Sequence, residues 1–111
     1  MTPETVIAIY RPRPGREEEL AALLREHVPL LRDEGLATNR PVVLLRSRQD
    51  GSYLEIFEWA SQEAMERAHR NPRVLALWEH FAGASEYLPF ASLHEATALF
   101  PSFEAVDGLV E

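Results

Sequence analysis

The stretch "FEWASQEAMERAHRNP", residues 57–72, contains signals for a strand end, a short helix and the start of a second helix. Ser61 follows the strand-like run "YLEIFEWA" and is a good N-cap, because its hydroxyl can accept a backbone N–H bond from the first helical turn. Asn71-Pro72 repeats this signal, with Asn71 as cap and Pro72 at the first helical position. The stretch therefore predicts a strand, a helix to residue 70 and a helix from residue 71 to about residue 83.

The segments on either side predict the remaining elements. Residues 5–11, "TVIAIYR", form a β-branched and aromatic run that indicates a strand. Residues 16–35 predict a helix, with Gly35 as its C-terminal cap and a kink at Pro29, after His27. Residues 41–48 and 53–60 flank Asp50-Gly51 and indicate a hairpin. Residues 93–100, "LHEATALF", have strand character.

The resulting order is β-α-β-β-α-β, which is typical of a ferredoxin-like split βαβ fold with a four-stranded antiparallel sheet. We expect one domain over residues 1–100 and a C-terminal tail over residues 101–111. Several strands are apolar on both faces, since residues 6, 8 and 10 alternate with equally apolar residues 7 and 9. Helices can cover only one face of such a sheet, so we expect a second copy of the chain to cover the other. The sequence thus predicts a homodimer.

Composition excludes several classes of function. The 111 residues include no Cys, which excludes disulfides, Fe–S clusters and a cysteine nucleophile. All eleven basic residues are Arg, so a Lys Schiff base is excluded too. A formal net charge of -7 disfavours nucleic acid and anionic membranes. We find no membrane-spanning run and no signal-peptide pattern, and we expect a cytoplasmic protein.

Taken in order, these segments resemble a known family. "VIAIYRPRPGREEELAALLREHVPLLRDEG", the hairpin and "EWASQEAMERAHRNPRVLALWEHF" are similar to the antibiotic-biosynthesis-monooxygenase-like dimeric α/β barrels, in a subgroup without an established activity. The resemblance implies two sheets stacked across a two-fold axis, with a pocket between the sheet and the helices of each subunit. It also implies small-molecule ligands, and in some members cofactor-free oxygenation of phenols and quinols.

The residues that the family's haem-degrading members use are not matched. Their Asn, Trp and His would fall near Ala8, Ala68 and Trp78 of this chain. The resemblance therefore does not imply haem degradation, and we expect no cofactor.

Two histidines are candidate catalytic residues. His27 projects from the middle of the leucine stripe of residues 16–35, where a buried neutral imidazole suits a base or a hydrogen-bond donor. The alternative is a core histidine bonded to a neighbouring group. His69 precedes a helix break, where it can bond free carbonyls at the helix end or contact a ligand. The four histidines show no metal-ligand spacing, and we predict no metal site.

Aromatic side chains are the candidate ligand-binding residues, namely Trp59, Trp78, Tyr87 and Tyr10, although such residues more often form a core or a dimer contact. Glu55 lies in an apolar strand and needs a partner; we expect Arg46 or Arg48 across the hairpin. His80 should be exposed.

Two functional hypotheses remain. In the first, the chain is a cofactor-independent monooxygenase or isomerase of a small aromatic or enolisable metabolite, with His27 as base or donor and His69 assisting. In the second, it is a non-catalytic homodimer that binds a small hydrophobic ligand or has a structural role.

Overall fold

The computed structural model describes residues 2–107. Its strands are β1 (Glu4–Pro12), β2 (Val43–Arg46), β3 (Tyr53–Trp59), β4 (Ser85–Tyr87) and β5 (Glu104–Ala105). Its helices are α1 (Glu17–Asp33), α2 (Gln62–Ala68) and α3 (Pro72–Ala84), with two 3₁₀ turns, η1 (Phe90–Ser92) and η2 (His94–Thr97). The expected α+β, ferredoxin-like fold is confirmed.

The sheet is antiparallel and has the strand order β4-β1-β3-β2-β5. β1 and β3 form its centre and pair from Glu4 opposite Trp59 to Tyr10 opposite Tyr53. The short strand β4 pairs with β1 only from Tyr10 to Pro12. The half of β1 before Tyr10 therefore lies beyond the reach of β4.

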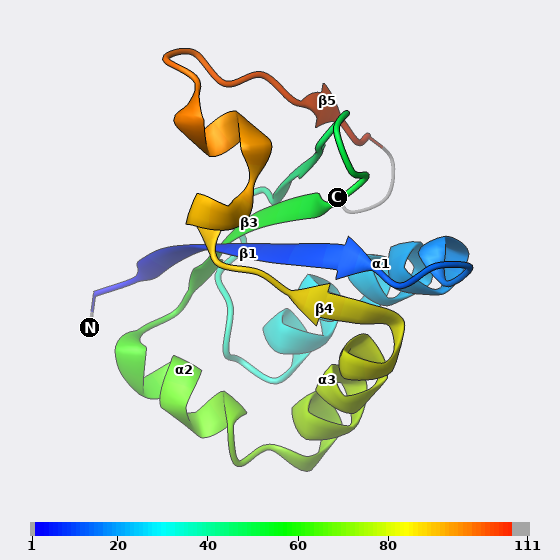
Figure 1. The fold of residues 1–111 in the computed structure, drawn as a ribbon. Coiled ribbons are helices and arrows are strands. Elements are labelled where there is room, and N and C mark those ends of the chain that lie inside the picture. The colour runs from blue at the N-terminus through cyan, green and yellow to red at the C-terminus, as the bar shows by residue number, and fades with distance from the viewer. Residues whose placement is uncertain (1, 108–111) are drawn as a thin grey trace.

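The three α-helices lie on one side of the sheet, and the C-terminal segment lies on the other (Figure 1). On the helix side, β1 and β3 alternate side chains toward α1 and α3, so that Tyr10 and Tyr53 join Leu24 and Phe81 in the core. On the opposite side, Leu93 of the C-terminal segment packs against Ile9 and Leu54. The second apolar face is thus covered in part by the chain itself, which the sequence analysis did not foresee.

The local signals for helix ends are confirmed. The Ser61 hydroxyl accepts the backbone N–H of Ala64 at 3.0 Å, and the Asn71 side chain accepts from Arg73 and Val74 at the start of α3. Gly35 has a φ of 73°, which permits the close turn after α1 in which Leu36 N–H bonds the Leu31 carbonyl. α1 runs through Pro29 as one continuous helix.

The strand predicted over residues 93–100 is wrong. Residues 94–97 form the turn η2, in which Ala96 N–H bonds the Leu93 carbonyl, and Leu99 and Phe100 stay 87% and 86% exposed. The place beside β1 is taken by β4, because Ser85 leaves α3 in an extended conformation. His94 accordingly lies in a 3₁₀ turn and is exposed.

The segment after Pro101 contributes a strand of its own. Glu104 and Ala105 form β5, which pairs with Arg46 and Leu45 of β2. This pairing brings the start of the expected tail, residues 101–111, onto the sheet edge, while residues 108–111 lie outside the described residues.

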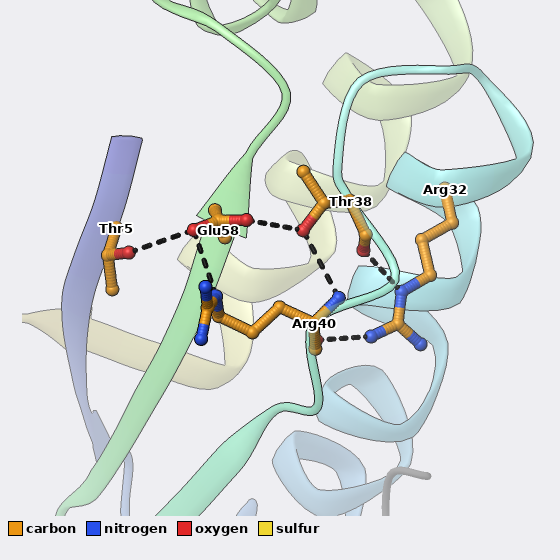
Figure 2. A network of polar contacts seen from close by, with 5 residues as sticks. All are labelled: Thr5, Arg32, Thr38, Arg40 and Glu58. Carbon is orange, nitrogen blue, oxygen red and sulfur yellow. Dashed lines mark hydrogen bonds and ion pairs between the residues drawn. The ribbon is translucent and has the colours of Figure 1, made fainter. Parts of the chain in front are cut away.

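A polar network fixes the loop between α1 and β2 (Figure 2). The Glu58 carboxylate accepts bonds from the Thr38 hydroxyl at 2.9 Å and from the Arg40 guanidinium at 2.9 Å. Arg32 of α1 donates to the backbone carbonyls of Thr38 and Arg40. The loop is thereby fastened to both α1 and β3, which leaves the neighbouring end of β3 in a defined position.

Candidate functional site

A pocket of about 530 Å³ lies between β1, α2 and α3. It lies where β1 continues past β4, so that Val6 and Ala8 form part of its wall. The wall is mostly apolar. All six residues singled out from the sequence line this pocket, namely Tyr10, His27, Trp59, His69, Trp78 and Tyr87. Their roles there stay predictions.

The alternation of side chains along β3 determines which of its residues face the pocket. Glu55, Phe57 and Trp59 are spaced two residues apart on β3, so their side chains share the face that looks toward the helices. Phe57 and Trp59 reach the pocket, whereas Glu55 lies behind its wall and is 0% exposed. Phe57 contributes an apolar ring to the wall.

His27 is buried, at 3% exposure, and both of its ring nitrogens have partners. Trp78 Nε1 lies 3.0 Å from His27 Nε2, and an indole N–H can only donate, so Nε2 carries no proton. The proton of the imidazole is therefore on Nδ1, which donates to Glu55 Oε1 at 2.9 Å. His27 is thus a neutral imidazole whose lone pair is occupied by Trp78.

The prediction that Arg46 or Arg48 pairs with Glu55 is wrong. Its carboxylate contacts His27 and the Tyr10 hydroxyl, which donates to Oε1 at 2.7 Å, rather than an arginine. Arg46 instead pairs with Glu104 of β5 at 2.7 Å. Arg46 lies opposite Tyr53 and therefore on the same sheet face as Glu55, but its guanidinium extends to Glu104 of the edge strand that the sequence analysis did not predict.

Four side chains from four elements therefore form one hydrogen-bonded chain behind the pocket wall: Tyr10, Glu55, His27 and Trp78. Both partners of Glu55 donate hydrogen bonds to its carboxylate oxygens, which is the arrangement expected for an ionised carboxylate. Burial, together with the Glu55 charge and hydrogen bond, raises the pKa of the Tyr10 hydroxyl well above its usual value. Tyr10 is accordingly a donor and stays protonated.

His69 bonds a carbonyl at the end of its helix, as one of its two predicted roles requires, and it also lines the pocket. Its Nδ1 lies 2.9 Å from the Met65 carbonyl, and because a carbonyl can only accept, Nδ1 carries a proton and fixes the end of α2. The ring also lies 5.0 Å from the Trp78 ring in an edge arrangement and lines the pocket. Its Nε2 has no partner among residues 2–107, so in the neutral imidazole this atom is a free acceptor.

Tyr87 lies at the mouth of the pocket and is 54% exposed. Its hydroxyl contacts the Trp78 carbonyl at 3.5 Å, which is too long to hold it firmly. Burial, and secondly the charge of Glu55, raises the pKa of this phenol.

Sequence reasoning missed several residues of the site. Glu79, Met65 and Leu75 line the pocket, and Glu55 anchors His27 from behind. A signal for Glu55 was present, because one histidine in the leucine stripe of α1 and one glutamate on the inward face of β3 were both expected to be buried. Two buried polar groups on facing elements pair more often than they stay alone.

Within residues 2–107, no three His, Asp or Glu side chains are grouped as metal ligands. None of the described helices has the length and apolar character needed to cross a bilayer. His80 is exposed, as expected.

Comparison with known proteins gives a family and a fold. A family model described as antibiotic biosynthesis monooxygenase matches residues 3–80. The solved structure of Rv0793 from Mycobacterium tuberculosis is similar, with a TM-score of 0.62 and 25% sequence identity over 86% of this chain and 100% of that one. A search of curated proteins finds no match.

Proposed function

Because the chain belongs to the antibiotic biosynthesis monooxygenase family, we propose that its pocket binds a small, flat and largely apolar molecule. The observation that carries this proposal is the wall itself. Trp59, Trp78 and Tyr87 present rings to one space of about 530 Å³, a size that suits a small ligand. The buried polar groups beside it are already bonded to one another, so apolar contact and ring stacking provide the binding energy.

Filling the pocket tests this proposal. Leu75 lines the pocket and is 43% exposed, so Leu75→Trp adds bulk at the mouth without disturbing the core. Leu99→Trp makes the same change at an exposed position outside the pocket. We expect 2-naphthol and similar probes to raise the Tm of the wild type and of Leu99→Trp, and to raise that of Leu75→Trp much less. Equal responses of the two variants would place binding elsewhere.

A second candidate function is cofactor-independent oxygenation, and the geometry of His69 favours it. With Nδ1 bonded to Met65, the free Nε2 of His69 can accept a proton from an acidic C–H or O–H group of a bound substrate. The resulting carbanion reacts with dioxygen, and a CH₂ group becomes a carbonyl as one oxygen atom leaves in water. The same proton transfer without dioxygen would give an isomerase.

His27 can take the role of base only after Trp78 moves away from its Nε2. In the closed arrangement its role is to orient Trp78. We therefore assign the proton acceptor to His69 and the positioning role to His27.

Oxygen uptake with anthrone-like and quinol probes tests this second function. His69→Asn removes the acceptor, and His80→Asn is the matched control because His80 is exposed and does not line the pocket. We expect uptake to be slower by about 10²-fold or more in His69→Asn only, because general base catalysis contributes about 10²–10⁴-fold. Binding of the probes without uptake in the wild type would leave the non-catalytic ligand-binding protein as the function.

We further propose that two copies associate through the outer face of the sheet. Ile7 and Val43 both lie opposite Ile56 in the ladder, and they stay 50% and 45% exposed beside the area that Leu93 covers. Exposed apolar rows of this kind mark association surfaces. Val43→Glu should convert a dimer into a monomer in sedimentation equilibrium, with Leu75→Glu, an exposed position of α3 on the helix side of the sheet, as the control. A wild-type monomer at tens of micromolar would refute the proposal.

A further inference from the structure

We propose that the pocket selects its ligand by charge, and that it favours a flat aromatic amine in protonated form over the same ring carrying a carboxylate. This inference rests on the proposed ligand-binding function and names the chemical class of the ligand. It follows from the distribution of charge around the pocket wall, which is negative on two sides and contains no fixed positive charge.

The first negative charge is Glu55, directly behind the wall. It is 0% exposed, and its two donors, the Tyr10 hydroxyl and His27 Nδ1–H, are neutral groups. A buried carboxylate is normally paired with a cation, because neutral donors stabilise it only in part. Within residues 2–107, no Arg is hydrogen-bonded to this carboxylate. Its charge therefore remains uncompensated toward the pocket that Tyr10 and His27 line.

The second negative charge is Glu79, which lines the pocket from the exposed side of α3. No Arg lines the pocket within the described residues, and the sequence contains no Lys. The histidines are the only lining residues that can become cationic, and His27 is held neutral by Trp78. A carboxylate or phosphate on the ligand would find no partner there.

The rings of the wall complement a cation as well. Trp59, Trp78 and Tyr87 all contribute to the same space, and the faces of such rings attract ammonium groups. Attraction by ring faces and attraction by Glu55 act in the same direction, so a protonated amine satisfies both. A neutral ligand uses the stacking alone.

Two tyrosines lie in the same surroundings as the proposed ligand. Burial and the nearby Glu55 charge raise the pKa of both Tyr10 and Tyr87, which lie on the wall and at the mouth. Burial, and secondly the charge of Glu55, disfavour a phenolate there and would disfavour a ligand carboxylate for the same reasons.

Three probes with one ring system test the inference: 2-naphthylmethylamine, 2-naphthalenemethanol and 2-naphthoate. Their Kd values are compared at about pH 8, above the range in which histidines usually titrate. At an effective dielectric of about 20, a charge within roughly 10 Å changes affinity by about tenfold or more. We expect the amine to bind best and the carboxylate at least about tenfold more weakly. A carboxylate that binds as well as the amine would overturn the inference.

Three substitutions test which carboxylate causes the preference for the amine. Glu55→Gln keeps the shape of the side chain and should reduce the preference for the amine about tenfold, while Glu79→Gln should reduce it by a smaller factor because that carboxylate is exposed to solvent. Glu66→Gln makes the same change at an exposed position of α2 outside the pocket and should leave the preference unchanged. If Glu55→Gln fails to fold, the wild-type ranking of the probes and the Glu79→Gln value still decide the question.

The outcomes separate this inference from the proposed function. If none of the three probes binds, ligand binding in the pocket itself is refuted. If the alcohol binds and Leu75→Trp weakens it, but the amine gains nothing, the pocket stands and the charge selection fails. If the amine binds best and Glu66→Gln weakens it as much as Glu55→Gln, the selection arises from the net charge of the chain instead.

Discussion

Trp78 Nε1 donates a hydrogen bond to His27 Nε2 at 3.0 Å, and this single contact determines what the buried histidine can do. The bond joins α3 to α1 across the edge of the pocket, between residues 51 positions apart in the chain. Because it occupies the only lone pair of the neutral ring, the histidine proton lies on the side of Glu55. A residue that suits a catalytic base by position thereby becomes a support for an aromatic ring that lines the pocket.

Removing the indole N–H donor should leave His27 Nε2 without a hydrogen-bond partner. In Trp78→Phe the ring is kept but the N–H is lost, so Nε2 faces the pocket without a partner. We expect the free energy of unfolding to fall by about 1–3 kcal/mol, from the lost hydrogen bond and the smaller ring. Imidazole ¹⁵N shifts should show a neutral ring protonated on Nδ1 in the wild type and a change at Nε2 in the variant.

Trp59→Phe is the matched control, because Trp59 lines the same pocket but its indole N–H has no described partner on His27. Its His27 ¹⁵N shifts should equal those of the wild type. Wild-type shifts that report a proton on Nε2 would contradict the assignment of the tautomer.

Glu55 should be the most sensitive polar residue of the site. Glu55→Ala leaves the Tyr10 hydroxyl and His27 Nδ1–H buried without an acceptor, and we expect a loss of about 3–5 kcal/mol. Glu55→Gln retains one oxygen for these donors and should lose about 1–2 kcal/mol. Urea unfolding measures both values. Similar losses for Ala and Gln would mean that the acceptor contributes little.

The parts of the fold that could be predicted from sequence are those with local causes. Ser61 and Asn71 cap helices with their own side chains, and Gly35 permits a positive φ that other residues disfavour, so short stretches suffice to predict these ends. The strand predicted over residues 93–100 does not form, because a local alternation of buried and exposed residues is not enough without a free strand to pair with. Leu93 and Glu95 are both buried, yet β4 already occupies the edge of β1.

Six of the residues that line the pocket could be predicted from the sequence, but the contacts between side chains could not. Periodicity places His27 inward on α1 and Glu55 inward on β3, but their contact depends on the distance between a helix and a sheet. The free Nε2 of His69 likewise follows from the Met65 carbonyl, whose position only the folded end of α2 provides.

Tyr10 should make the stability of the protein depend on pH in the alkaline range. Its pKa is raised in the folded state, so its contribution to stability is complete below the unfolded pKa of about 10 and is lost as pH rises above that value. We expect the Tm of the wild type to fall more steeply than that of Tyr10→Phe above about pH 10. Absorbance at the phenolate band should show no Tyr10 titration before unfolding. Parallel Tm curves would refute the raised pKa.

Glu58 should make the stability of the protein depend on pH in the acidic range. The Thr38 hydroxyl, followed by Arg40, lowers the pKa of the Glu58 carboxyl, so its stabilising contribution is present above the unfolded pKa of about 4.3 and is lost as pH falls through the lower folded value. Glu58→Gln should therefore melt below the wild type near about pH 7, and the difference should shrink below about pH 4. Glu66→Gln, an exposed change on α2, should show no such convergence. A difference in Tm between wild type and Glu58→Gln that stays constant with pH would mean that the network in Figure 2 stabilises the loop by shape alone, without the charge of Glu58.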